Sequence, residues 1–226
     1  MDILNKKINF HIHTKYSFDS LLEPSFIVDY LFQNGFDAAI ITDHNTIKGA
    51  VEAQEYATKK YKDKFTVIIG EEVKSDIGDI IGFPLEEEVE PGDWETVVMK
   101  MKQQGAFLCL PHPYKSHNLF LIHQEEFINQ FDFIEIFNAR INDKLNEHAF
   151  NLAEKYKKIK IVGNDAHVKS DLLNCSNYYD GSLETPVFTT NKTHLRNVRH
   201  SQIINYYKKR NIAETLKYSL LYFIGK

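Results

Sequence analysis

The sequence predicts an α/β fold built on a parallel β-sheet, either open or closed into a barrel. Short apolar runs rich in β-branched residues alternate with longer amphipathic stretches. Such strand-then-helix units place successive strands in parallel. A chain of 226 residues suits a single α/β barrel, and no linker, internal repeat or low-complexity segment divides it. We therefore expect one domain over residues 1–226.

The predicted elements follow in order along the chain. Strands are expected at residues 7–12, 38–42, 65–69, 79–83, 106–110, 133–137 and 159–163. Amphipathic helices are expected at 23–35, 47–61, 94–105 and 146–158. The first helix carries clear end signals, because Glu23, Pro24 and Ser25 suit its first turn and Gly35 suits its end.

The C-terminal segment 191–226 differs in charge from the rest of the chain. It holds eight basic residues and one acidic residue, a balance of +7, whereas the 19 basic and 30 acidic residues before it give −11. We expect a helical stretch over about 196–224 that packs on the barrel and leaves its charges in solvent. Its apolar residues would provide the packing surface: Ile203, Ile204, Tyr207, Leu216, Leu220, Leu221 and Phe223.

Composition predicts a soluble cytoplasmic protein. The two cysteines, Cys109 and Cys175, form no disulfide framework or CxxC motif, which fits a reducing compartment. The N-terminus lacks the apolar core of a signal peptide, and no run approaches membrane-spanning length. The sequence contains no GxxxxGK(S/T), GxGxxG, GxSxG or HExxH motif. The signatures of phosphate-loop NTPases, dinucleotide-binding proteins, serine hydrolases and zincins are therefore missing.

Metal-binding residue types gather in short islands, and nearly every island follows a strand-like run. They are His11, His13 and Asp19; Asp43 and His44; Glu72; Asp79; His112; and Asp165 and His167. On a strand, residues spaced i and i+2 share one face, so the first two histidines suit one ion. Alternatively, those histidines merely edge the sheet, and Asp19 caps a turn. Strand ends are where barrels and open sheets collect ligands.

Histidine combined with carboxylate, without cysteine, suits Zn²⁺, Mn²⁺ or Fe²⁺. The candidate ligands exceed the need of one ion, so two or three clustered ions are expected. Such a cluster lowers the pKa of bound water and supplies hydroxide at neutral pH, while it neutralises phosphoryl oxygens. Hydrolysis is therefore the expected reaction class.

Seven motifs in this order carry a family resemblance: FHIHTKYSFDS, ITDHNT, GEE, GDIIGF, LPHP, EIFNAR and GNDAH. Over about residues 8–168, the chain resembles the polymerase and histidinol phosphatase (PHP) family of metal-dependent phosphoesterases. The resemblance implies a distorted (βα)7, TIM-like barrel, here with a C-terminal helical extension. It also implies a di- or trinuclear centre of Mn, Fe or Zn at the carboxyl ends of the strands.

The resemblance also implies how the ligands are shared. One ion would be held by His11, His13, Glu72 and Asp165, a second by Glu72, Asp79 and His112, and a third by Asp19, His44 and His167. Asp79 stands where related phosphatases often have histidine, so this ligand departs from the family pattern. The family spacing of Gly, any residue and Glu selects Glu72 over Glu71.

Candidate catalytic residues are His44, Asp165 and His167. A phosphate group also calls for cationic partners, and Lys115 and Arg140 are the candidates, although each also fits a surface charge. Asn138 is a candidate for substrate binding, and it or Glu135 would orient ligands or substrate unless both are ordinary strand-end polar residues. Substrate selection is expected in loops 114–131 and 171–186.

The leading functional hypothesis is hydrolysis of a phosphomonoester or small nucleotide phosphodiester through metal-bound hydroxide. One alternative is a nuclease acting on longer RNA or DNA, for which the basic C-terminal segment gives modest support. No strip of interleaved aromatic and basic residues indicates nucleic acid, and no feature indicates a membrane partner. Another alternative is a non-catalytic metal-binding regulatory module, which the nearly complete ligand set disfavours.

Overall fold

The computed structural model describes residues 4–116, 124–184 and 186–224. Within these ranges one nine-stranded sheet has the order β7-β6-β5-β4-β3-β2-β1-β8-β9. Its strands are β1 (Lys7–Ile12), β2 (Ala38–His44), β3 (Thr66–Ser75), β4 (Gly78–Phe83), β5 (Phe107–Leu110), β6 (Phe133–Asn138), β7 (Ile159–Gly163), β8 (Cys175–Tyr179) and β9 (Pro186–Thr190). All seven predicted strands are present.

The sheet curves into a nearly closed barrel. Strands β1, β2 and β3 are parallel, as are β5, β6 and β7. The backbone N–H groups of Asn164 and Ala166 donate to Phe10 and His11 at 3.0 and 3.1 Å, which joins the end of β7 to β1. Strand β4 runs antiparallel to β3, because only two residues separate the two strands and leave no room for a crossover helix. It is also antiparallel to β5. The predicted distorted TIM-like barrel is confirmed.

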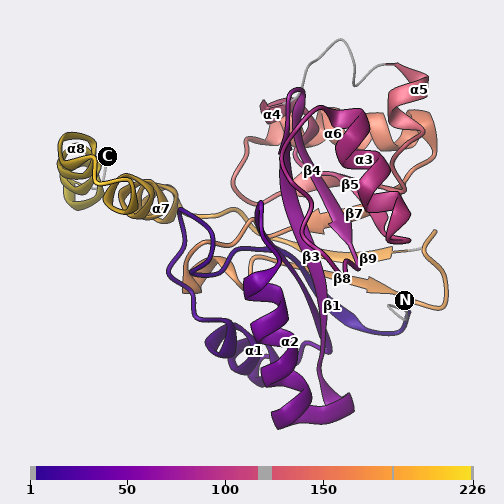
Figure 1. Cartoon of the computed structure of the whole chain (residues 1–226), viewed down its shortest axis with the longest axis horizontal. Coiled ribbons are helices and arrows are strands. Elements are labelled where there is room, and N and C mark those ends of the chain that lie inside the picture. The colour runs from indigo at the N-terminus through magenta and orange to yellow at the C-terminus, as the bar shows by residue number, and fades with distance from the viewer. Residues whose placement is uncertain (1–3, 117–123, 185, 225–226) are drawn as a thin grey trace.

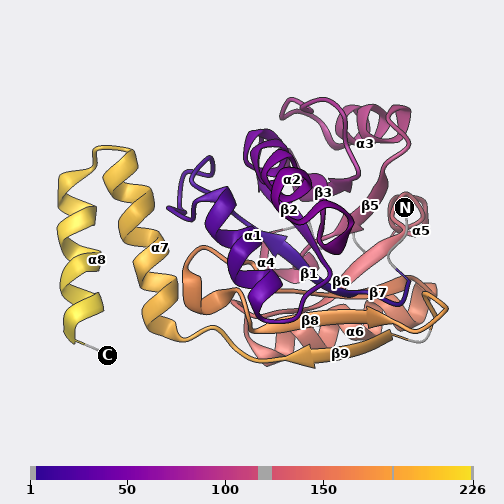
Figure 2. The same ribbon diagram turned by 90° about the horizontal axis from the view of Figure 1, so that it is seen from below.

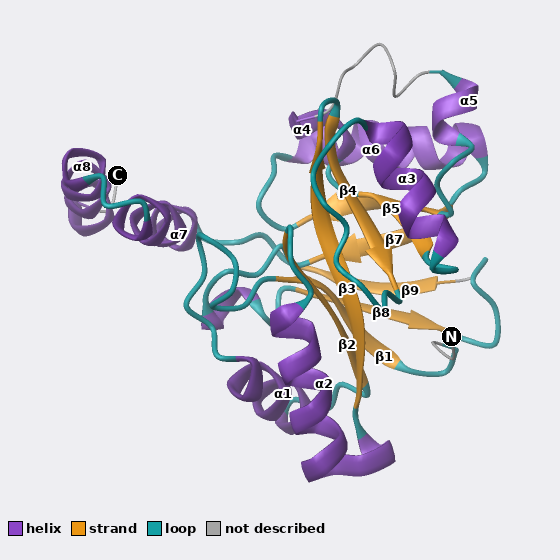
Figure 3. Cartoon of the chain, in the orientation of Figure 1, coloured by secondary structure: helices purple, strands orange, loops and turns teal. Residues whose placement is uncertain are grey.

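The four predicted helices are present as α1 (Pro24–Gln33), α2 (Lys48–Tyr61), α3 (Trp94–Gln103) and α6 (Asp143–Tyr156). Short helices α4 (Pro113–Ser116) and α5 (Glu125–Ile128) and the 3₁₀ turns η1 (Lys62–Lys64) and η3 (Lys169–Asp171) complete the barrel. Figures 1 and 3 show α1 and α2 together on one flank of the sheet. The end signals of α1 hold: Pro24 lies in its first turn and Gly35 adopts a left-handed φ of 73°.

Apolar side chains from the strands fill the barrel interior. Phe10, Ile40, Ile81, Phe83 and Phe133 come from four different strands and are buried in one cluster. Separate clusters bury the inward faces of α1 and α2 and of α3 and α6. The packed interior leaves polar side chains to gather at the carboxyl ends of the strands, where a barrel fold places its functional groups.

Strands β8 and β9 form a hairpin that the sequence did not predict. The hairpin pairs antiparallel with the start of β1, through Lys7 opposite Tyr178 and Ile8 opposite Asn177. Its sequence is polar, and the buried amide of Asn177 bonds to both the N–H and the C=O of Val162 at 2.8 Å. Because side-chain hydrogen bonds stabilise this hairpin, it lacks the apolar alternation by which strands are recognised.

The C-terminal segment forms two helices, α7 (Leu195–Lys208) and α8 (Ile212–Ile224), that lie side by side and project from the barrel (Figures 1 and 2). Arg210 adopts a left-handed φ of 55° and reverses the chain between them. The helical stretch expected over about 196–224 is thus two helices, and part of its apolar surface is exposed. Ile204 on α7 is buried, whereas α8 packs mainly against α7 and exposes Leu216, Leu220 and Phe223.

None of the helices in the described parts of the chain has the length and apolar character needed to span a bilayer.

Candidate metal centre

The carboxyl ends of the strands bring the predicted ligands together in one buried cluster. His11 lies in β1 and adopts a left-handed φ of 65°, at a register shift between Phe10 and Ile12. His13 follows the end of that strand. The sequence predicted a regular strand with both imidazoles on one face. The register shift changes the path of the backbone at His11. Both imidazole rings nevertheless reach the same carboxylate, that of Glu72. Such backbone strain is typical of functional sites.

Glu72 is the central carboxylate of the cluster. Its Oε2 lies 3.4 Å from the Nε2 atoms of both His11 and His13 and 3.0 Å from Nδ1 of His44. Its other oxygen, Oε1, lies 3.0 Å from Nε2 of His112. Four histidines from three strand ends and the first loop therefore surround one carboxylate, which can be shared between ions.

Glu71 points to the opposite side of β3. Its Oε2 accepts a hydrogen bond of 2.8 Å from the backbone N–H of Val89. Burial raises the pKa of Glu71 to about 8, so this carboxyl group is largely protonated at neutral pH. The alternation of a strand therefore places Glu72, and not Glu71, toward the other predicted ligands.

Asp165 completes the first group of ligands with His11, His13 and Glu72. Its Oδ1 lies 3.9 Å from Nε2 of His11 and 3.5 Å from Nε2 of His13. Both Nε2 atoms are buried and make no hydrogen bond within the described chain. Buried nitrogen atoms without partners are costly unless something else binds their lone pairs. A divalent cation bound between these nitrogens and carboxylates would accept the lone pairs of both Nε2 atoms.

The second group consists of Glu72, Asp79 and His112, whose ligand atoms all lie within 4.8 Å of one another. Asp79 reaches this group because β4 is antiparallel to β3. Glu72 pairs with Ile81, and Asp79, two residues away, shares its face of the sheet. Burial and the nearby Glu72 raise the pKa of Asp79, as expected for two carboxyl groups that crowd one site without a cation.

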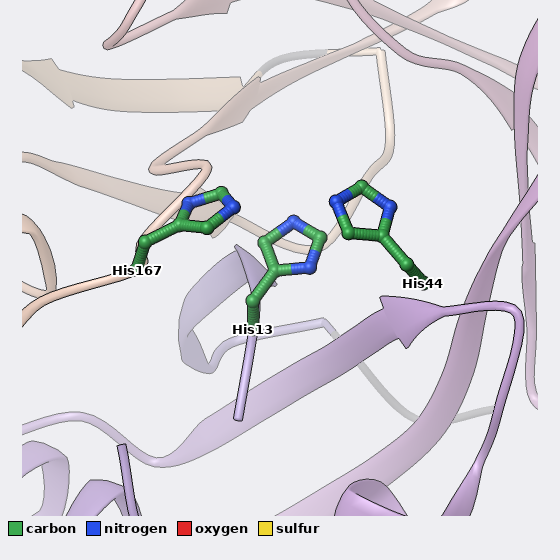
Figure 4. A group of neighbouring side chains, drawn as sticks. All are labelled: His13, His44 and His167. Atoms are coloured by element: carbon green, nitrogen blue, oxygen red, sulfur yellow. The ribbon is translucent and has the colours of Figure 1, made fainter. Parts of the chain in front are cut away.

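The third group surrounds His44 and His167. The imidazoles of His13, His44 and His167 lie together (Figure 4), with ring centroids of His13 4.3 and 4.2 Å from those of the other two. Asp19 faces the same place, with Oδ2 2.9 Å from Nε2 of His167 and 3.7 Å from Nε2 of His44. Burial, with the neighbouring His167 and His44, lowers the pKa of His13 to about 3, so its ring is neutral and its lone pair available.

Glu135 supports the first group from below. The Nδ1 atom of His11 and Oε1 of Glu135 lie 2.8 Å apart, and a carboxylate partner makes this nitrogen the donor. The lone pair of His11 therefore resides on Nε2, which faces Glu72. The close approach requires glycine at position 163, since a Cβ there would overlap Oε1 of Glu135. The sequence indicated Glu135 as an orienting residue, although Glu135 was not among the predicted site residues.

Asp43 lies among the predicted islands, but it supports the first loop instead of facing the cluster. It accepts hydrogen bonds of 2.6 Å from the backbone N–H and the hydroxyl of Thr14 and from the hydroxyl of Ser17. Gly49 leaves space for this pairing, because a Cβ there would overlap both Asp43 and Thr14. The loop that leads from His13 to Asp19 is thereby fixed to the end of β2.

A pocket of about 220 Å³ opens above the three groups. Its lining residues are Asp19, His44, Glu72, Asp79, His112, Lys115, Arg140, Asp165, His167, Val198, Ser201, Gln202 and Asn205. Both predicted phosphate-binding cations are in this set. The Lys115 side chain is 47% exposed, with Nζ 3.6 Å from Oδ2 of Asp165. The Arg140 guanidinium contacts Asp171 at 3.0 Å and also Ser201, which leaves further N–H donors unassigned.

Asn138 does not line this pocket. It is fully buried, and its amide donates to Oε2 of Glu135 at 3.0 Å and to Oδ2 of Asp165 at 3.3 Å. The amide therefore lies behind the carboxylates that it orients, so the structure places Asn138 where it holds ligands, away from the pocket in which substrate would bind.

One wall of the pocket consists of residues that sequence reasoning missed. Val198, Ser201, Gln202 and Asn205 belong to α7, and scattered polar positions on a helix give no sequence signal of a site. Among the described residues of the predicted selection loop 171–186, which leave out residue 185, none lines the pocket. Of the other loop, 114–131, residues 117–123 lie outside the described chain; among the rest, only Lys115 lines the pocket.

Comparison with known proteins identifies the family. A model of the PHP domain matches residues 9–213, so the chain belongs to the PHP domain family. An uncharacterized protein of Methanocaldococcus jannaschii is 37% identical over 159 residues, covering 64% of this chain and 90% of the relative.

Solved structures show a similar fold. A two-domain protein from Bacteroides vulgatus that contains a predicted PHP-like metal-dependent phosphoesterase has a TM-score of 0.61 at 18% identity; the match covers 90% of this chain and 63% of that chain. PsfC from Pseudomonas syringae has a TM-score of 0.60 at 13% identity, over 92% of this chain and 99% of that chain. The chain thus spans less than two thirds of the Bacteroides protein.

Proposed function

We propose that this protein is a metal-dependent phosphoric ester hydrolase that cleaves a small phosphomonoester or the terminal phosphodiester of a short nucleotide. The observation that carries the proposal is the arrangement of three overlapping ligand groups around Glu72, beneath a pocket that also presents Lys115 and Arg140. Metal ions activate water and neutralise phosphoryl oxygens, and adjacent Lys and Arg side chains bind phosphate, so both features in one place suit phosphoester hydrolysis.

The ligand groups would hold three divalent ions of Mn, Fe or Zn. His11, His13, Glu72 and Asp165 would hold the first; Glu72, Asp79 and His112 the second; and Asp19, His44 and His167 the third. When bound, such ions lower the pKa of water and neutralise phosphoryl oxygens. The unpartnered buried nitrogens of His11 and His13 support this assignment.

The chain's own residues would hold and orient the substrate. Lys115 and Arg140 would bind phosphoryl oxygens through charge-assisted hydrogen bonds. His44, Asp165 and His167, which we assign to catalysis, line the pocket where the phosphoryl group would bind. Helix α7 covers one side and would exclude bulk water from the reacting group.

The size of the pocket supports a small substrate. A volume of about 220 Å³ accommodates a phosphoryl group with a modest leaving group. Helix α7 forms one wall and narrows the approach that a long nucleic acid strand would need. The basic charge of 191–226 keeps a nuclease as the second candidate, because phosphate backbones bind to clustered Lys and Arg.

Metal-reconstituted protein should be tested against a panel of phosphomonoesters, dinucleotides and RNA. The proposal expects turnover of at least one small phosphoester, its loss on chelation, and its loss in the His11→Ala variant. Preference for long RNA would instead support the nuclease. Metal binding without turnover of any substrate class would support the regulatory module.

A further inference from the structure

Helix α7 contacts both of the loops that supply ligands to the third group. Asp19 lies seven residues beyond the end of β1, and His167 lies four residues beyond the end of β7. The ligands of the first two groups, in contrast, lie within strands or within two residues of a strand end. The third group therefore depends on loop conformation more than the other two do.

Lys208, the last residue of α7, holds the loop that carries Asp19. Its Nζ donates to the backbone C=O groups of Lys15, Ser17 and Ser20 at 2.9, 2.6 and 2.7 Å. An ammonium group has three N–H donors, and all three are used by this one loop. Three carbonyls that converge on one cation fix the path of the backbone on both sides of Asp19.

Asn197, near the start of α7, holds the loop that carries His167. Its amide donates to Oδ1 of Asp171 and to the hydroxyl of Ser170, both at 2.8 Å. The other oxygen of Asp171 accepts from the backbone N–H of His167 at 3.3 Å. The two ends of α7 thus contact the two loops separately, one through Lys208 and the other through Asn197.

We propose that α7 assembles the third metal subsite, with Lys208 and Asn197 as positioning residues that hold Asp19 and His167 around His44. The inference rests on the metal centre proposed above and adds a regulating element to it. Docking of α7 against the barrel favours binding of the third ion. Conversely, the third ion favours the docked position of α7, because coupling between two binding events is reciprocal.

The test counts ions and measures their affinities, independently of catalysis. Apoprotein is dialysed against buffered free Mn²⁺, and bound metal per chain is determined by elemental analysis. In Lys208→Met we expect the two tighter ions to bind as in the wild type, while the Kd of the third rises roughly 10- to 100-fold, as for loss of other groups that orient metal ligands.

Lys217→Met is the matched control. Lys217 is an exposed lysine on α8 whose recorded ion pair is with Glu214, three residues away, so its loss should leave all three affinities unchanged. Asn197→Ala tests the second contact independently, and it decides the matter if Lys208→Met does not fold by circular dichroism. Hydrogen exchange supplies a further readout: amides of residues 203–208 should gain protection between two and three equivalents of Mn²⁺.

Selective weakening of the third ion in Lys208→Met or Asn197→Ala supports the proposal. It is overturned if both folded variants bind the third ion as the wild type does, or if they lose all three ions together. A wild-type chain that binds only two ions also overturns it. In that case, metal-dependent turnover of a phosphoester would leave the proposed function standing, so the two failures can be told apart.

Discussion

The Nδ1 atom of His11 donates to Oε1 of Glu135 across 2.8 Å, although the two residues are 124 positions apart in the chain. This contact directs the other ring nitrogen toward Glu72. A buried carboxylate that orients a ligand histidine is a recurrent support of metal sites.

Glu135→Gln should weaken metal binding without removing any ligand. The amide keeps the shape of the side chain but loses the charge that makes Nδ1 the donor, so we expect roughly a 10- to 100-fold loss of affinity for the first ion. Titration of apoprotein with Mn²⁺ measures this. Wild-type affinity in the variant would contradict the role given to Glu135.

Purified protein should contain at least two transition-metal ions per chain. The histidines and carboxylates of the cluster exceed the coordination needs of one ion. Elemental analysis after mild purification, supported by anomalous scattering from crystals, checks the content. Protein that remains free of metal under metal-replete conditions would contradict the metal centre.

Substitutions of the ligands should differ in severity. His11→Ala or Asp165→Ala should nearly abolish hydrolysis, because each removes a ligand of the first ion. Asp79→Ala should reduce it less, since Asp79 serves only the second ion. Steady-state kinetics on the best substrate provide the comparison. An Asp79→Ala defect equal to that of His11→Ala, with activity retained in Asp165→Ala, would show that the division of ligands is wrong.

Lys115→Met should lower kcat/KM while metal content stays normal. Loss of a charge-assisted bond of ~1.5–3 kcal/mol corresponds to roughly one to two powers of ten in kcat/KM. Arg140→Met should lower kcat/KM similarly, but it also breaks the buried contact with Asp171 and is expected to reduce stability. Wild-type kinetics in both variants would leave phosphate binding to the metal ions alone.

Gly163→Ala should destabilise the fold, since the added methyl group would overlap Oε1 of Glu135. We expect a loss of ~1–3 kcal/mol in the free energy of unfolding, typical of overpacking in a buried site. Urea denaturation of apoprotein measures it. Gly92→Ala is the control, because no atom lies within 4 Å of the corresponding Cβ there. Equal stability of the two variants would exclude the steric explanation.

Local patterns determined most of the barrel. The seven apolar runs form strands and the four amphipathic stretches form helices. These elements were predictable because the periodicity of apolar residues shows which face of an element is buried. The hairpin of β8 and β9 escaped prediction, since Asn177 supplies hydrogen bonds where an apolar side chain would have given a signal. Likewise, the length and apolar content of α8 did not indicate whether its apolar side chains would pack against the barrel or stay exposed.

By itself, the sequence determined which residues are candidate ligands, since histidines and carboxylates after strand-like runs meet at one edge of a parallel sheet. Only the tertiary structure decided how they are supported. Glu135 beneath His11, Asn138 behind Asp165, and Lys208 on the Asp19 loop act across separations of 124, 27 and 188 or more residues. No local pattern encodes such pairs, because hydrogen bonds depend on positions in space that only the closed barrel and the docked helix α7 create.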